Sequence, residues 1–113
     1  METKASFYQE ATRRTAIYPG ALNNTNNAIT YCVLGLSGEA GEIANKWKKV
    51  LRDGVPREEI RQKMVGELGD VMWYVARIAD ELGIDLQYLM DKNLDKLARR
   101  KSQGTLQGSG DQR

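Results

Sequence analysis

Residues 60–82 read IRQKMVGELGDVMWYVARIADEL, and this stretch decides the fold. Its apolar side chains recur every three or four residues, which is the spacing of one face of an α-helix. They are Ile60, Met64, Leu68, Val71, Met72, Val75, Ile78, Ala79 and Leu82. Proline suits the first turn of a helix and glycine the position just past its end. With Pro56 before the stretch and Gly83 after it, the sequence predicts one long helix.

The rest of the chain is also predicted to be helical. A second long helix is expected to begin at the cap-type residues 23–25 and to end at Asp53-Gly54. Its apolar positions are Ala28, Cys32, Leu36, Ile43, Ala44, Trp47, Val50 and Leu51. Shorter helices are expected over 3–16 and from Asp85 to Lys101, and a glycine-rich tail occupies 102–113. No segment alternates with a period of two, so the predicted fold class is all-α.

The length of the two predicted long helices has a consequence for the oligomeric state of the protein. A chain of 113 residues is expected to form a single domain, 1–113. Helices of this length would each be about 40 Å long at 1.5 Å per residue, and such rods expose apolar sides unless a partner covers them. We therefore expect a four-helix-bundle-like core that is completed by homo-oligomerisation, in a homodimer or a dimer of dimers.

Composition excludes several classes of function. A net charge of +2 and the lack of a basic recognition helix argue against a nucleic-acid partner. Apolar runs are too short to span a membrane, and the polar residues 1–4 do not resemble a signal core. One cysteine, Cys32, fits a cytoplasmic protein. Because the chain has no histidine, any metal site must use oxygen ligands, which favours Mg²⁺ or Mn²⁺.

Two segments share a pattern of acids and glycines, Gly38-Glu39-Ala40-Gly41-Glu42 and Gly66-Glu67-Leu68-Gly69-Asp70. Acids three residues apart project from one face of a helix. Glycine inside a helix costs about 1 kcal/mol relative to alanine. One interpretation is that the glycines allow a close approach of two helices, which gathers four carboxylates around a divalent ion. The other is that such pairs are solvated helix faces, since acidic pairs at this spacing also arise by chance. The residues alone leave both open.

Several further side chains have the spacing to contact a phosphate. Lys46 lies one turn after Glu42, and Tyr74 lies one turn after Asp70. Lys96 and Arg100 are also one turn apart, which suits a grip on one polyphosphate. The alternative for these two is that cations near a helix C-terminus complement its dipole.

In its motifs the chain resembles the MazG-like nucleotide pyrophosphohydrolases of the all-α NTP pyrophosphatase superfamily. The resemblance rests on the ordered acids of the two segments and on flanking motifs along nearly the whole chain. These are Tyr18-Pro19-Gly20, Leu34 to Glu42, Gly66 to Tyr74, Asn93 to Arg100 and Gly108 to Arg113. The sequence does not depart from the family's acidic pattern.

The resemblance implies an enzyme that hydrolyses nucleoside triphosphates to the monophosphate and pyrophosphate with Mg²⁺ or Mn²⁺. It implies that Glu39, Glu42, Glu67 and Asp70 hold the metal, and that one of them takes the proton of the attacking water. It also implies that Asn93, Lys96 and Arg100 contact phosphate oxygens. The alternative is a catalytically inactive helical oligomer that binds nucleotides or a protein partner. The tail is expected either to fold over a bound nucleotide or to fray.

Overall fold

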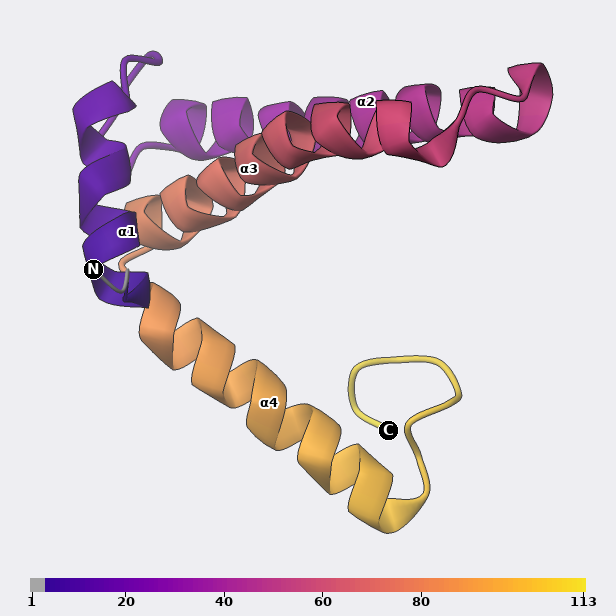
Figure 1. Ribbon diagram of the computed structural model, residues 1–113. Coiled ribbons are helices and arrows are strands. Elements are labelled where there is room, and N and C mark those ends of the chain that lie inside the picture. Colours follow the sequence, from indigo (N-terminus) through magenta and orange to yellow (C-terminus); the bar gives the residue numbers. More distant parts are fainter. Residues whose placement is uncertain (1–3) are drawn as a thin grey trace.

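The computed structural model describes residues 4–113, and every regular element in this range is a helix (Figure 1). The elements are α1 (Ala5–Thr12), the short 3-10 turn η1 (Arg13–Thr15), α2 (Asn26–Asp53), α3 (Arg57–Glu81) and α4 (Leu86–Gln103). The all-α prediction with two long central helices is therefore confirmed. The predicted first helix is shorter than expected, and its residue 3, like Met1 and Glu2, lies outside the described residues.

The helix ends follow the local sequence. Thr25 caps α2, because its hydroxyl accepts a hydrogen bond from the backbone N–H of Ala28 at 3.1 Å. At the other end of α2, Gly54 adopts a left-handed conformation with φ 68°. Asp85 caps α4 by accepting from the N–H of Gln87 at 3.0 Å. The connection between α2 and α3 is short, because α2 ends at Asp53 and α3 begins at Arg57. The two helices therefore fold back on each other, which brings the two acidic segments side by side.

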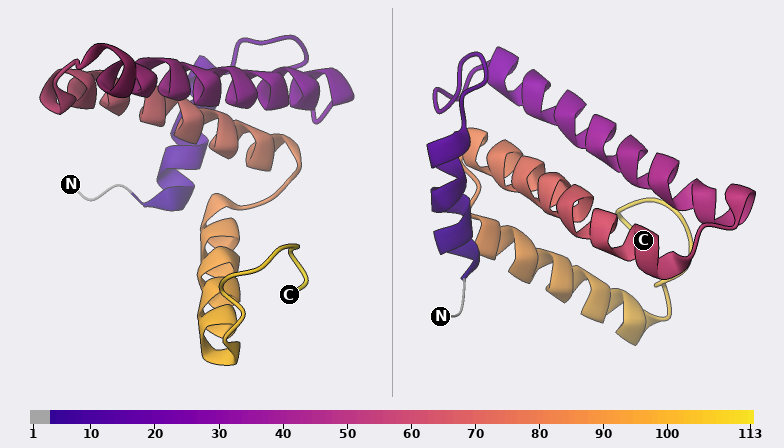
Figure 2. Two further views of the ribbon diagram at one scale, coloured as in Figure 1. Left: turned by 90° about the vertical axis from the view of Figure 1, so that its right-hand side faces the viewer. Right: turned by 45° about the horizontal axis from the view of Figure 1, so that its top comes forward.

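The helices form an open arrangement rather than a closed bundle. Helices α2 and α3 run side by side as a hairpin, α1 crosses near one end of it, and α4 diverges from the pair (Figures 1 and 2). The radius of gyration is 16.7 Å. A compact domain of this length would have about 13 Å. One chain alone therefore leaves α4 largely unpacked, with contacts mainly at its beginning.

A buried polar cluster anchors α3 to the segment before α2. Its centre is the Glu81 carboxylate, which accepts from the Tyr18 hydroxyl at 2.6 Å and from the backbone N–H groups of Leu22 at 2.7 Å and Asn24 at 3.0 Å. The fully buried Arg77 donates to Glu81 at 3.3 Å and to the Tyr18 oxygen at 3.1 Å. Buried charges need such complete pairing, so this cluster fixes how α3 meets the 18–24 loop.

The glycines of the acidic segments do not mark the closest helix contact, so that part of the interpretation was wrong. A Cβ added at Gly38, Gly41, Gly66 or Gly69 would meet no described atom within 4 Å. The close contact is instead at Gly35, where an added Cβ would overlap the end of the Tyr74 ring. The recurring glycines therefore face open space, and α2 and α3 pack most tightly one turn before the first acid.

This difference between glycines is testable within α2. Gly38→Ala is expected to stabilise the chain by about 0.5–1 kcal/mol, because alanine loses less backbone freedom on folding. Gly35→Ala is expected to destabilise it by about 1–3 kcal/mol, because the added methyl group overpacks against Tyr74. Urea unfolding followed by circular dichroism measures both. A Gly38→Ala variant less stable than the parent would contradict the open environment of that residue.

Candidate metal centre

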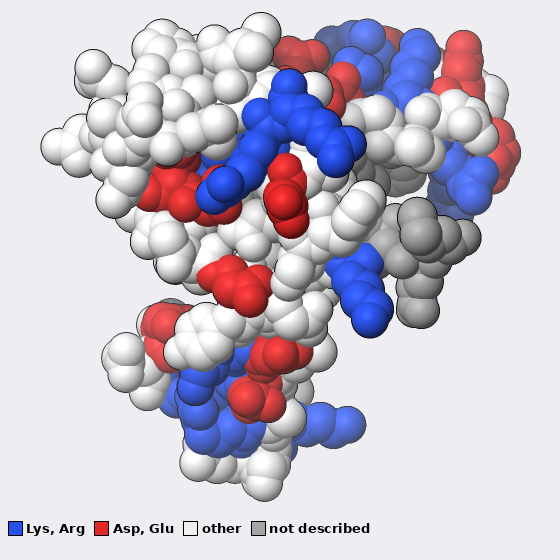
Figure 3. Space-filling model, turned by 90° about the vertical axis from the view of Figure 1, so that its left-hand side faces the viewer, with Lys and Arg blue, Asp and Glu red and all other residues white. Residues whose placement is uncertain are grey.

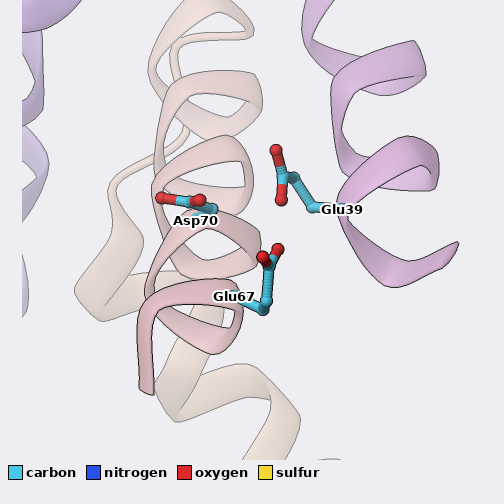
Figure 4. A group of neighbouring side chains, drawn as sticks. All are labelled: Glu39, Glu67 and Asp70. Carbon is cyan, nitrogen blue, oxygen red and sulfur yellow. The ribbon is translucent and has the colours of Figure 1, made fainter. Parts of the chain in front are cut away.

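Three of the predicted acids meet between α2 and α3. Glu39 comes from α2, while Glu67 and Asp70 lie one turn apart on α3 (Figure 4). One carboxylate oxygen from each lies within 4.8 Å of the other two. Glu39 and Glu67 are partly buried, and Asp70 is exposed. The i,i+3 spacing on α3 and the side-by-side packing of the hairpin produce this cluster, as the sequence predicted for these three residues.

The carboxylates of Glu39 and Glu67 lie close enough to shift each other's pKa in opposite directions. Hydrogen bonding to Glu67 raises the pKa of Glu39, and burial and the charge of Asp70 raise it further. The same hydrogen bond, followed by that from Lys46, lowers the pKa of Glu67. The Nζ of Lys46 lies 3.1 Å from Glu67 Oε1 and 3.7 Å from Glu42 Oε2. The ammonium group of Lys46 thus offsets part of the repulsion among the acids.

The residues of this cluster fit a hard divalent cation. Glu67 Oε2 is buried and finds no hydrogen-bond partner within residues 4–113. A buried carboxylate oxygen without a partner is costly, and a cation would satisfy it. Oxygen ligands alone suit Mg²⁺ or Mn²⁺. Glu39, Glu67 and Asp70 are therefore the residues that can hold such an ion.

Glu42 lies outside this group of three. Its side chain is 53% exposed, and its carboxylate is close to Lys46 rather than to the other acids. Lys46 was predicted as a candidate phosphate contact, and it lies beside the acids instead of in open solvent. Glu42 and Lys46 thus border the cluster on its α2 side, about one and two turns beyond Glu39.

Tyr74 packs within the hairpin, and Tyr8 approaches from α1. The Tyr74 ring makes an edge contact with Trp73 at 5.0 Å between centroids, and burial raises the pKa of its hydroxyl. Sequence reasoning missed Tyr8, whose pKa is raised by burial and then by Asp70. Tyr8 belongs to a short, weakly amphipathic helix, so its sequence context carried no signal. Together with apolar residues of α3 and α4 it lines a hollow of about 630 Å³.

The predicted phosphate-binding residues on α4 are not brought to the acids within one chain. Lys96 and Arg100 instead contact Asp111 of the tail, while Asn93 is exposed beside them. Helix α4 diverges from α2 and α3 in Figure 1, which separates the two sets of residues. Any site that uses both sets needs a rearrangement or a second chain.

Comparisons with known proteins identify the family of the chain. The family model described as "MazG nucleotide pyrophosphohydrolase domain" matches residues 28–105, a range that contains all four predicted acids. The "Gene 37 protein" of Mycobacterium phage L5 is 52% identical over 109 residues, which cover 94% of this chain and 96% of that protein. No solved structure matches the chain. Within residues 4–113, no helix is both long and apolar enough to cross a membrane.

Proposed function

Because the chain belongs to the MazG nucleotide pyrophosphohydrolase family, we propose that it hydrolyses nucleoside triphosphates to the monophosphate and pyrophosphate. The reaction would use Mg²⁺ or Mn²⁺ held by Glu39, Glu67 and Asp70, with Glu42 as a fourth ligand. The observation that carries this proposal is the group of three neighbouring carboxylates, in which one oxygen of Glu67 is buried without a hydrogen-bond partner. Ribo- and deoxyribonucleotides are both candidate substrates.

Each side chain of the centre has a distinct part in this proposal. A bound divalent ion would supply charge stabilisation to a phosphoryl group and lower the pKa of a coordinated water. The acids must be deprotonated to act as ligands, so metal binding works against the raised pKa of Glu39. A carboxylate not fully engaged as a ligand would accept the proton of the attacking water. Lys46, once released from Glu67, would be free to contact a phosphate oxygen, and the Tyr74 hydroxyl would border the same space.

We further propose that the working form is a homo-oligomer, either a dimer or a dimer of dimers. The chain exposes 8208 Å² of surface. A compact monomer of its mass would expose about 6,200 Å². Large apolar side chains are exposed along α3 and along α4, at Val65, Leu68, Met72, Met90, Leu94 and Leu97. A second chain that covers these faces would complete a four-helix core and could bring Asn93, Lys96 and Arg100 to the acids. Sedimentation as a 12.7 kDa monomer would contradict this.

We propose no nucleic-acid partner, and we place the reaction in the cytoplasm. On the face shown in Figure 3, basic and acidic side chains are interspersed rather than gathered in a basic patch. Strong phosphate-backbone binding needs such a patch. The single free cysteine, Cys32, is in keeping with a reducing compartment.

One assay tests the proposed reaction directly. The protein is incubated with Mg²⁺ or Mn²⁺ and a panel of ribo- and deoxyribonucleoside triphosphates, and the products are identified by chromatography. Monophosphate and pyrophosphate are expected. Diphosphate and phosphate would show that a different bond is cleaved. Absence of turnover with every nucleotide would favour the inactive helical oligomer that binds nucleotides or a protein partner.

A further inference from the structure

The C-terminal tail folds back along α4 and contacts the residues proposed to bind phosphate. Lys96 Nζ donates to Asp111 Oδ1 at 2.7 Å. Arg100 Nη2 donates to the carbonyl oxygen of Asp111 at 2.6 Å and to its Oδ1 at 3.1 Å. A carboxylate oxygen and a carbonyl oxygen of Asp111 thus accept hydrogen bonds from these two cations, as phosphate oxygens are able to do. Figure 2 shows the tail looping beside α4.

The tail forms this contact as a closed loop. The guanidinium group of Arg113 donates to the carbonyl oxygens of Thr105 at 3.0 Å, Leu106 at 2.9 Å and Gly110 at 2.6 Å. Gly108 and Gly110 have φ values of 128° and 84°, which only glycine adopts readily. The loop therefore holds its own shape through Arg113, while Asp111 provides its ion pairs to α4.

The two sides of this contact differ in their exposure to solvent. Arg100 is 4% exposed, and its Nε is buried without a hydrogen-bond partner in the described chain. The Asp111 side chain is 70% exposed. The Lys96–Asp111 pair, whose side chains are 30% and 70% exposed, is of the solvent-accessible kind that contributes little. A diphosphate carries more charge than one carboxylate and has enough oxygens to satisfy the remaining Arg100 donor.

We propose that the tail is an internal competitor for the anion site on α4, with Asp111 in place of a substrate phosphate. This inference rests on the proposed phosphate-binding role of Lys96 and Arg100. The polyphosphate displaces Asp111, and residues 104–113 leave α4 when it binds. The same loop closes again after the anionic product departs, so the tail favours product release as well as limiting substrate affinity.

Binding of inorganic pyrophosphate in EDTA tests this without any dependence on hydrolysis. Asp111→Asn is expected to bind pyrophosphate about fivefold more tightly than the parent by calorimetry, which corresponds to about 1 kcal/mol. Removal of any negative charge near the site would also strengthen the binding of an anion, so a control variant is needed. Asp95→Asn is suitable, because Asp95 lines the same hollow on α4 and forms no ion pair among the described residues. It is expected to change the affinity by less than about twofold.

The second measurement follows the tail itself. In the parent protein, pyrophosphate is expected to shift the backbone amide resonances of Gly108 and Gly110 towards those of an unstructured chain. Any of three results would overturn the inference. The tail resonances could stay unchanged when the protein is saturated with pyrophosphate, Asp111→Asn and Asp95→Asn could bind pyrophosphate equally tightly, or neither variant could bind it. Displacement of the tail in a protein that hydrolyses no nucleotide would leave the inference standing and contradict the proposed function instead. Circular dichroism checks that each variant keeps its helices.

Discussion

Glu67→Gln is expected to lower kcat/KM for nucleoside triphosphate hydrolysis by at least about a hundredfold, since even groups that only support metal ligands typically cost ten- to a hundredfold. Glu67 contacts both Glu39 and Lys46, and its second oxygen is buried without a partner. An amide at this position keeps the shape of the side chain but lacks the charge that holds a divalent ion. Calorimetry with Mn²⁺ is expected to show a parallel loss of metal affinity.

Matched variants separate this effect from a general loss of charge. Glu58→Gln removes an exposed acid from the first turn of the same helix and is expected to leave turnover and Mn²⁺ affinity unchanged. Asp70→Asn is expected to abolish turnover while the helical dichroism persists. Glu42→Gln is expected to do the same, because Glu42 is the proposed fourth ligand. Mn²⁺ affinity retained in Glu67→Gln would mean that this cluster is not the metal site.

The fold and the three-acid cluster could be predicted because they follow from local periodicity. Apolar spacing defines α3, and proline, glycine, threonine and aspartate define the helix ends. Once the hairpin is fixed, acids on facing turns must approach each other. Glu42 shows the limit of this reasoning. A helical turn places it on the same side as Glu39, but its carboxylate lies outside the group of three acids and 3.7 Å from Lys46 Nζ.

Contacts between residues far apart in the sequence could not be predicted from local periodicity. The contact of Gly35 with Tyr74 depends on the relative rotation of two helices, which no local pattern sets. The contact of Asp111 with Lys96 and Arg100 depends on the path of an aperiodic tail. The buried cluster around Glu81 did leave a signal that was overlooked. Arg77 and Glu81 stand at i,i+4 among apolar residues at the end of α3, where unpaired charges would be costly.

Glu81→Gln is expected to destabilise the fold by about 3 kcal/mol, as is typical when one partner of a buried ion pair is lost. The carboxylate accepts from Tyr18, Leu22, Asn24 and Arg77. An amide has only one oxygen, so its NH₂ group must face at least one of these donors. At about 4–8 °C per kcal/mol, the midpoint of thermal unfolding is expected to fall by roughly 12–24 °C. Glu10→Gln, at an exposed acid on α1, is the control and should shift it little.

Because Glu81 is ionisable, its contribution to the stability of the fold should depend on pH, whereas a contribution from packing alone would not. Burial alone would raise the pKa of Glu81, but the donors around it outweigh burial and lower the pKa overall. A carboxyl group with a lowered pKa in the folded state contributes stability above its unfolded pKa, about 4.3. That contribution is lost as pH falls through the folded pKa. The difference in thermal midpoint between the parent and Glu81→Gln should therefore be constant from pH 7 to about pH 5 and narrow below about pH 4. Protonation of a charged carboxylate in this cluster must reduce its contribution to stability. A difference in thermal midpoint that stays constant down to pH 3 would therefore mean that Glu81 stabilises the loop through its shape alone.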